Sequence, residues 1–158
     1  MKYLVRNSIA LLILALFASI AFAQSTDEVV ALVKKTKDAV ESNAFQTFAR
    51  INRAEHPYKN KDNPSLYVFV FDTDLNVVAH AFKLGAVGKN VKGKPDVKGK
   101  MFRDEMLDRA LREGSGWVDY YYENPKTKKV AHKSAYFELA NGSNGEKYVI
   151  GSGKYFDE

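Results

Sequence analysis

The chain of 158 residues contains no cysteine, which excludes a disulfide framework, a thiolate nucleophile and any zinc or iron–sulfur site built on cysteine. Histidine is also scarce, with three residues, His56, His80 and His132. Their spacing matches no metal-binding motif such as HExxH. The length suits a single domain rather than an enzyme with a separate cofactor module. We therefore predict no metal site, no cofactor and no catalytic residues.

Two short stretches imitate ligand-binding loops but lack residues that those loops need. Residues 88–94 have the glycine spacing of a phosphate-binding loop, yet Pro95 stands where a Ser or Thr must reach the magnesium ion. Residues 72–83 open like a calcium-binding EF-hand loop, but Val77 and Lys83 replace its glycine and its bidentate glutamate. Neither nucleotide nor calcium binding is predicted.

The N-terminus has the features of a secretory signal peptide. Lys2 and Arg6 form a short positive segment, residues 9–20 are almost entirely apolar, and residues 21–23 (Ala-Phe-Ala) match a cleavage site. The alternative is an uncleaved membrane anchor, although the apolar run is short for a bilayer span of about 20 residues. We predict cleavage after Ala23, a signal peptide over 1–23, a single domain over 24–158, and a location in the periplasm or outside the cell.

Cleavage would also lower the formal charge from +5 to +3, because Lys2 and Arg6 would leave with the signal peptide. Five of the remaining lysines lie in the glycine-rich stretch 85–100. They are diluted by glycine and are not interleaved with aromatic residues, as a nucleic-acid surface requires. We therefore predict no nucleic-acid partner, and a membrane partner only if the N-terminal segment is retained.

Apolar residues between Asp27 and His56 recur at helical spacing, which predicts a long helix with a break or kink at Ser42-Asn43. The residues Leu66–Asp72 and Asn76–Phe82 are rich in strand formers and read as a hairpin. The stretch 85–99 is too rich in glycine and lysine for regular structure, so we expect a loop there.

A second helix is predicted at Met101–Glu113, followed by strands at Trp117–Glu123, Val130–Ala140 and Lys147–Tyr155. One helix, five antiparallel strands and an inserted helix give an α+β fold. We expect both helices on one face of this sheet.

A polar and aromatic cluster falls on these strands. Strand alternation places Tyr120 and Tyr122 on one face and Trp117 on the other, while His80 interrupts an otherwise apolar strand. Lys133 stands among alanine and aromatic residues, where a cation is costly to bury unless it meets an anion. One interpretation is an enclosed pocket for a small carboxylate. The other is a surface lysine with its head group in water, ordinary aromatic packing and a hydrogen-bonded histidine.

The order and spacing of several motifs resemble those of the single Cache domain family. The resemblance rests on Gly88-Lys89-Asn90, Gly99-Lys100-x-Phe102, the run from Gly116 to Pro125, Lys133-x-x-Tyr136, and the closing Ile150 to Tyr155, with Ala79-His80 in the strand before the loop. It covers roughly Asp27 to Tyr155, most of the mature chain.

The resemblance implies a PAS-like fold, in which a long N-terminal helix packs on a central antiparallel sheet of about five strands. It also implies an extracytoplasmic sensor of small molecules, often carboxylates or amino acids. Tyr120, Tyr122, Lys133 and Tyr136 would be ligand-binding residues, with His80 and Trp117 close by and Lys133 as the charge partner of the ligand. Lys133 and Tyr136 have opposite strand parity, so both can face a ligand only through a bulge or from different sides.

We expect a binding protein whose ligand is a small carboxylate, either a keto acid, a short organic acid or an amino acid. Its expected partner is a separate membrane receptor or transporter. Two alternatives stay open: a hydrolase or lyase that uses His80 as a base, and an interaction protein that docks through the lysine-rich loop.

Overall fold

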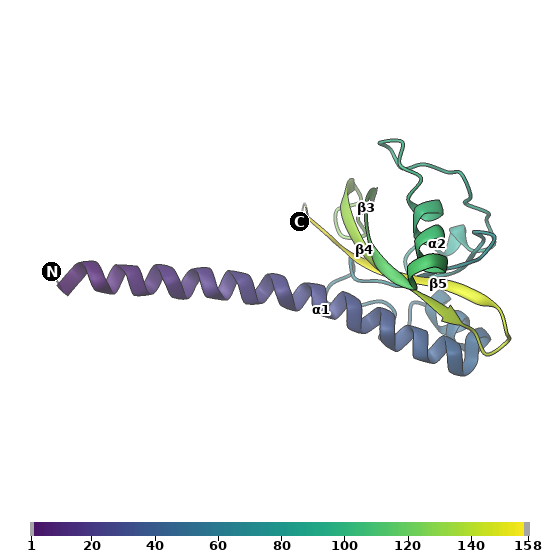
Figure 1. Ribbon diagram of the computed structural model, residues 1–158, viewed down its shortest axis with the longest axis horizontal. Helices are drawn as coiled ribbons and strands as arrows, with labels where there is room; N and C mark the ends of the chain where they lie inside the picture. Colours follow the sequence, from purple (N-terminus) through teal and green to yellow (C-terminus); the bar gives the residue numbers. More distant parts are fainter. Residues whose placement is uncertain (1, 157–158) are drawn as a thin grey trace.

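The structure is a computed structural model that describes the backbone of residues 2–156 and the side chains of residues 26–156. The side chains of the predicted signal peptide, residues 1–23, therefore lie outside the described residues. Helix α1 (Lys2–Asn52) projects from the domain at its N-terminal end (Figure 1). Where side chains are described, no helix is long and apolar enough to cross a membrane.

The predicted break in α1 is confirmed at Asn43, whose backbone is non-helical (φ −154°, ψ 91°). The side-chain oxygen of Asn43 accepts a hydrogen bond from the Gln46 amide at 3.1 Å and so caps the helical segment that follows. The Ala44 amide, freed by the break, donates to Ser143 Oγ at 3.0 Å. The kink thus fastens α1 to the turn between the last two strands.

Five antiparallel strands form one sheet: β1 (Phe69–Asp72), β2 (Val77–His80), β3 (Ser115–Glu123), β4 (Val130–Asn141) and β5 (Lys147–Tyr155). Their order across the sheet is β2-β1-β5-β4-β3, so the last strand of the chain lies at the centre. The predicted α+β fold is confirmed. A short 3-10 helix, η1 (Leu84–Ala86), and helix α2 (Phe102–Glu113) lie between β2 and β3.

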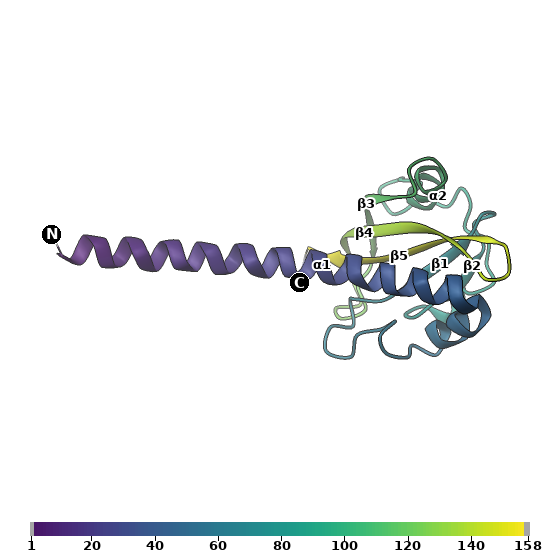
Figure 2. The ribbon, with the colours of Figure 1, turned by 60° about the horizontal axis from the view of Figure 1, so that its bottom comes forward.

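The two long helices cover opposite faces of the sheet, as Figure 2 shows. Lys37 of α1 pairs with Glu138 at 3.5 Å, whereas Arg109 of α2 lies 5.5 Å from the ring centroid of Phe137. Neighbouring residues of a strand point to opposite faces, so the expectation of both helices on one face is wrong. The long connection after β2 carries the chain around the sheet, where α2 buries its own apolar side.

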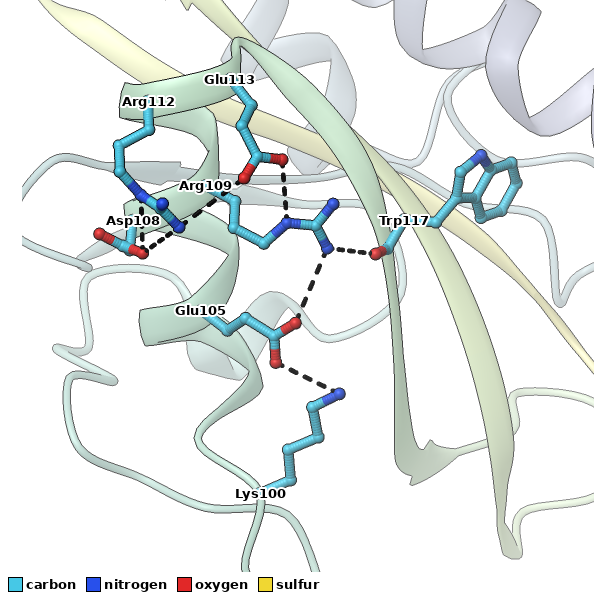
Figure 3. A network of polar contacts seen from close by, with 7 residues as sticks. All are labelled: Lys100, Glu105, Asp108, Arg109, Arg112, Glu113 and Trp117. Carbon is cyan, nitrogen blue, oxygen red and sulfur yellow. Dashed lines mark hydrogen bonds and ion pairs between the residues drawn. The ribbon is translucent and has the colours of Figure 1, made fainter.

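Arg109 holds α2 in place over the second face (Figure 3). Its Nη1 donates to the backbone oxygen of Trp117 at 2.6 Å, and its guanidinium pairs with Glu113 at 3.2 Å and Glu105 at 3.7 Å. Lys100 extends this network to Glu105 at 3.2 Å. These contacts fix the first turn of α2, which lies against the candidate site.

Candidate functional site

Lys133 of β4 is fully buried, on the sheet face that α2 covers. Among the described residues its Nζ has no hydrogen-bond partner. The nearest groups are the faces of five aromatic rings, which we call the aromatic cage. The distances from Nζ to the ring centroids are 4.0 Å for Tyr67, 5.0 Å for Tyr155, 5.4 Å for Phe69, and 5.9 Å for both Tyr120 and Tyr122.

The strand register builds this arrangement. Lys133 pairs with Tyr120 of β3 on one side and with Tyr155 of β5 on the other, and residues paired across strands share a face. Gly153 of β5 leaves room for the lysine stem, because a Cβ atom there would lie 2.8 Å from Lys133 Cε and 2.5 Å from the backbone oxygen of Ser134. Lys133 therefore lies close over the strand, beneath the rings.

Burial lowers the pKa of Lys133 well below its ordinary value, because the charged form loses its hydration. Ring faces attract a cation, but they do not replace the three acceptors that an ammonium group uses in water. No ion pair of Lys133 exists within the described part of the chain. The site therefore has a buried basic nitrogen that lacks an acceptor.

His80 ends β2 and lies beside the same rings, stacked on Tyr67 with 5.3 Å between ring centroids. Its Nδ1 accepts hydrogen bonds from the backbone amides of Phe82 at 3.2 Å and Lys83 at 2.9 Å. Burial, aided by the positive charges of Lys133, Lys83 and Arg103, lowers the pKa of His80 to about 3. The neutral ring thus carries its proton on Nε2, which makes it a hydrogen-bond donor and not a general base at neutral pH.

A cavity lies over the aromatic cage, on the side toward α2. Its volume is about 340 Å³ including its mouth. About 30 Å³ of it is free for the centre of a water molecule, so the side chains nearly fill it. The lining residues are Tyr67, Phe69, Phe71, Val77, His80, Ala86, Val91, Phe102, Arg103, Tyr120 and Tyr122.

Lys133 is not on the cavity wall but lies behind it. Tyr67, Phe69, Tyr120 and Tyr122 both line the cavity and face the Lys133 ammonium group. A bound anion would therefore meet Lys133 only after these rings rearrange. His80 by contrast lines the cavity directly.

Arg103 is a second cation at the cavity. It stands in the first turn of α2, with its guanidinium carbon 4.1 Å from the ring centroid of Phe102 and 5.8 Å from that of Tyr122. Its Nη1 donates to the backbone oxygen of Lys94 at 3.3 Å, which ties it to the preceding loop. Planar guanidinium groups suit carboxylate recognition.

The structure does not bring Trp117 and Tyr136 to this cavity. Their rings pack together, 5.4 Å between centroids, on the sheet face that α1 covers. The Tyr136 hydroxyl donates to Glu138 at 2.7 Å, and Glu138 pairs with Lys37 of α1. The pairing of β4 with both neighbours runs without a bulge, so Lys133 and Tyr136 lie on opposite faces of the sheet. Four of the six residues named from the sequence, Lys133, Tyr120, Tyr122 and His80, do meet.

Sequence reasoning missed the cage residues Tyr67, Phe69 and Tyr155 and the cation Arg103. The hydroxyls of Tyr67 and Tyr155 lie 3.1 Å apart, and the Tyr155 hydroxyl donates to the backbone oxygen of Glu123 at 2.8 Å. Tyr155 was part of the closing motif and could have been included on that ground. Tyr67 and Arg103 carry no signal of their own, because one lies in an apolar run and the other in a charged helix.

The lysine-rich loop is held against the edge of β3 by Asp96. Its carboxylate accepts hydrogen bonds from the backbone amides of Lys98 at 2.8 Å, Lys100 at 2.9 Å and Tyr121 at 2.8 Å. Lys98 lies over the ring of Tyr121, and Lys100 pairs with Glu105. Two of the five loop lysines therefore have partners within the domain, and the loop positions Arg103 at the cavity.

Comparison with solved structures shows the same fold in chemotaxis proteins and in a Cache chemosensory domain. A methyl-accepting chemotaxis protein from Vibrio parahaemolyticus is 19% identical, with a TM-score of 0.68 over 88% of this chain and 93% of that one. A periplasmic sensor domain of a chemotaxis protein is 21% identical, with a TM-score of 0.64 over 91% and 98%. A Cache chemosensory domain, studied for carboxylic acid recognition, is 18% identical, with a TM-score of 0.68 over 88% and 98%.

No curated protein matches this sequence. The family model described as Single Cache domain 2 matches residues 19–158, which is nearly the whole chain beyond the apolar run. The chain therefore belongs to the Single Cache domain 2 family.

Proposed function

We propose that this protein is an extracytoplasmic sensor domain that binds a small carboxylate in the cavity over the aromatic cage. The observation that carries the proposal is Lys133, a fully buried nitrogen without a hydrogen-bond partner among the described residues. Such a group is costly to keep in an apolar site. A carboxylate would supply the missing acceptor, and the Nε2–H of His80 would donate to it from the cavity wall.

The lining of the cavity favours a keto acid or a short organic acid over an amino acid. Within the described residues, none of the lining side chains is an aspartate or a glutamate. The ammonium group of an amino acid would therefore have no anionic partner on the cavity wall, and it would face the guanidinium group of Arg103. An apolar or carbonyl-bearing tail suits the tyrosine and phenylalanine walls.

Size bounds the affinity. A ligand of about six heavy atoms has a ceiling near −9 kcal/mol, so a dissociation constant in the micromolar range is expected. The family and the fold support a sensor, because one similar domain was studied for carboxylic acid recognition and another is a periplasmic sensor domain. We propose export through residues 1–23 and a separate membrane receptor or transporter as the partner.

The test is a thermal-shift and calorimetry panel with acetate, propionate, pyruvate, lactate, succinate and alanine. At about a hundredfold excess over the dissociation constant, a ligand adds about 2.7 kcal/mol to the free energy of unfolding, a shift of several degrees in Tm. Lys133→Met should abolish the shift. Lys35→Met, at an exposed position of α1, is the matched control and should leave it unchanged.

A panel without any shift on the wild-type protein contradicts the proposal. Binding of a panel member with equal affinity by wild type and Lys133→Met would also contradict it, because the role of Lys133 would then be structural.

The arrangement at His80 argues against a hydrolase or lyase. A base needs a free lone pair, but the Nδ1 lone pair already accepts two backbone amides and Nε2 carries the proton. An assay for turnover of the panel compounds tests this argument, and we expect no turnover.

A further inference from the structure

Lys133 is surrounded from every side by groups that provide no negative charge. Tyr67, before β1, and Tyr155, on β5, present ring faces to it, as do Tyr120 and Tyr122 on β3. Burial raises the pKa of Tyr67 and of Tyr120 well above the ordinary value, so both hydroxyls are neutral at physiological pH.

The remaining ionisable groups near the site are the basic residues His80, Lys83 and Arg103 and one acid, Glu123, whose carboxylate pairs with Lys83 at 2.9 Å. His80, Lys83 and Arg103 lie close enough for charge interactions, since the positive charges of Lys133, Lys83 and Arg103 all act on His80. In the ligand-free protein a charge on Lys133 would be opposed by desolvation, because its Nζ is buried and has no hydrogen-bond acceptor among the described residues. The empty site favours a neutral amine, and burial accordingly lowers the pKa of Lys133.

A carboxylate in the cavity reverses this balance. Once the rings that separate Lys133 from the cavity have moved aside, the bound anion gives the amine a hydrogen-bond acceptor and an opposite charge in a medium of low polarity, where the attraction is strong. The ammonium form then becomes the stable one, and its proton must come from solvent, because no acid among the described lining residues can supply it.

Building on the proposed function, we propose that the cavity binds its carboxylate together with one proton, which Lys133 takes up from solvent. The step is a proton transfer alone: the neutral amine of Lys133, the carboxylate anion and one solvent proton become an ammonium–carboxylate pair. No bond within the ligand forms or breaks. The occupied site is then a neutral pair, and affinity falls as pH rises.

The experiment is isothermal titration calorimetry with pyruvate and with propionate at about pH 8, in phosphate and in Tris. The two buffers differ in ionisation enthalpy, so the difference in observed heat gives the number of protons exchanged. We expect uptake of about one proton per ligand, and a dissociation constant that rises about tenfold per pH unit in the alkaline range.

A His80→Asn variant identifies the proton acceptor. The Asn side-chain oxygen can take the place of Nδ1 as the acceptor for the two backbone amides, but it does not titrate. Proton uptake that persists in His80→Asn supports Lys133, and uptake that disappears overturns the assignment. In the wild-type protein, lysine labelled with ¹³C at Cε gives a second measurement, because the Lys133 signal, assigned with Lys133→Met, should change on adding pyruvate.

The outcomes separate the two proposals. Binding without proton exchange and without a change at Lys133 Cε overturns the inference and leaves the proposed function intact. No binding of any panel carboxylate overturns both.

Discussion

At the scale of single residues, Lys133 and His80 show that an arrangement suited to binding can be unfavourable for the stability of the ligand-free protein. A buried amine without an acceptor is destabilising, yet β4 holds Lys133 beneath five rings. His80 in contrast satisfies its ring with two backbone amides and leaves one N–H for the cavity. A site prepared for an anion explains both arrangements.

The first prediction concerns the stability of the ligand-free protein. Lys133→Met keeps an unbranched side chain that is one atom shorter and removes the desolvated amine, so we expect the free energy of unfolding to rise by about 1–3 kcal/mol. Urea denaturation of both proteins without ligand measures it. A loss of stability of similar size would contradict the idea that Lys133 is retained for binding.

The second prediction concerns acid stability. The folded pKa of His80 is about 3, below the value of about 6.5 in an unfolded chain. Between these values the unfolded state binds the proton and the folded state does not, so stability falls as pH falls, by up to about 1.4 kcal/mol per pH unit. Above about pH 6.5 both states are neutral and the effect vanishes.

His80→Asn should flatten this dependence, because the asparagine does not titrate. Urea denaturation of wild type and variant from about pH 7 to pH 4 isolates the contribution of His80, since other acidic groups affect both proteins equally. Parallel curves would show that the ring is already protonated, or exposed, in the folded protein.

At the scale of elements, the central strand β5 shapes the site by what it lacks. Gly151 leaves room for the ring of Phe69, and Gly153 for the stem of Lys133. Both glycines lie in a strand, where the missing side chain is needed for the close approach of a neighbour. The kink at Asn43 also brings two elements together, because the Ala44 amide that it frees donates to Ser143 of the β4–β5 turn.

The third prediction tests this close approach. A methyl group in Gly153→Ala would lie 2.5 Å from the backbone oxygen of Ser134 and 2.8 Å from Lys133 Cε, so we expect a loss of about 1–3 kcal/mol and displacement of Lys133. Gly85→Ala is the control, because nothing lies within 4 Å of its Cβ position. Equal stability of the two variants, measured by thermal unfolding, would contradict the packing argument.

At the scale of the whole molecule, the sheet separates two layers with different roles. Helix α1 covers one face and α2 the other (Figures 1 and 2). The Trp117–Tyr136 pair lies on the face of α1, and the cavity lies on the face of α2. Thr26 of α1 receives a hydrogen bond from Lys154 at the end of β5 at 2.7 Å. The end of β5 also supplies Tyr155 to the aromatic cage, so Thr26 of α1 lies beside the strand that contributes to the site.

The fourth prediction concerns the N-terminal segment, residues 1–23, which we propose is a cleaved signal peptide. We propose that cleavage after Ala23 removes 23 of the 158 residues and leaves a mature chain that begins at Gln24. Intact mass spectrometry of protein recovered from the periplasm or the medium should show the shorter chain. A species of 17.8 kDa recovered from the membrane fraction would instead show that the segment is retained as an anchor.

The sequence alone determined the local features, because they depend on neighbours along the chain. Helical spacing predicted α1 and its break, and strand alternation placed Tyr120 and Tyr122 on one face and Trp117 on the other. The sequence also showed a lysine among alanine and aromatic residues, which is an unusual setting for a cation. Strand alternation also placed the side chains of Lys133 and Tyr136 on opposite faces of the sheet.

The tertiary structure decided which distant segments meet. Tyr67 and Tyr155, 88 positions apart in sequence, share a hydrogen bond because β5 inserts between β1 and β4. The face that α2 covers, and therefore the place of Arg103, follows from a long loop with no periodicity to read. Such pairings are set by burial and by strand order across the sheet, and the spacing of residues along the sequence predicts neither.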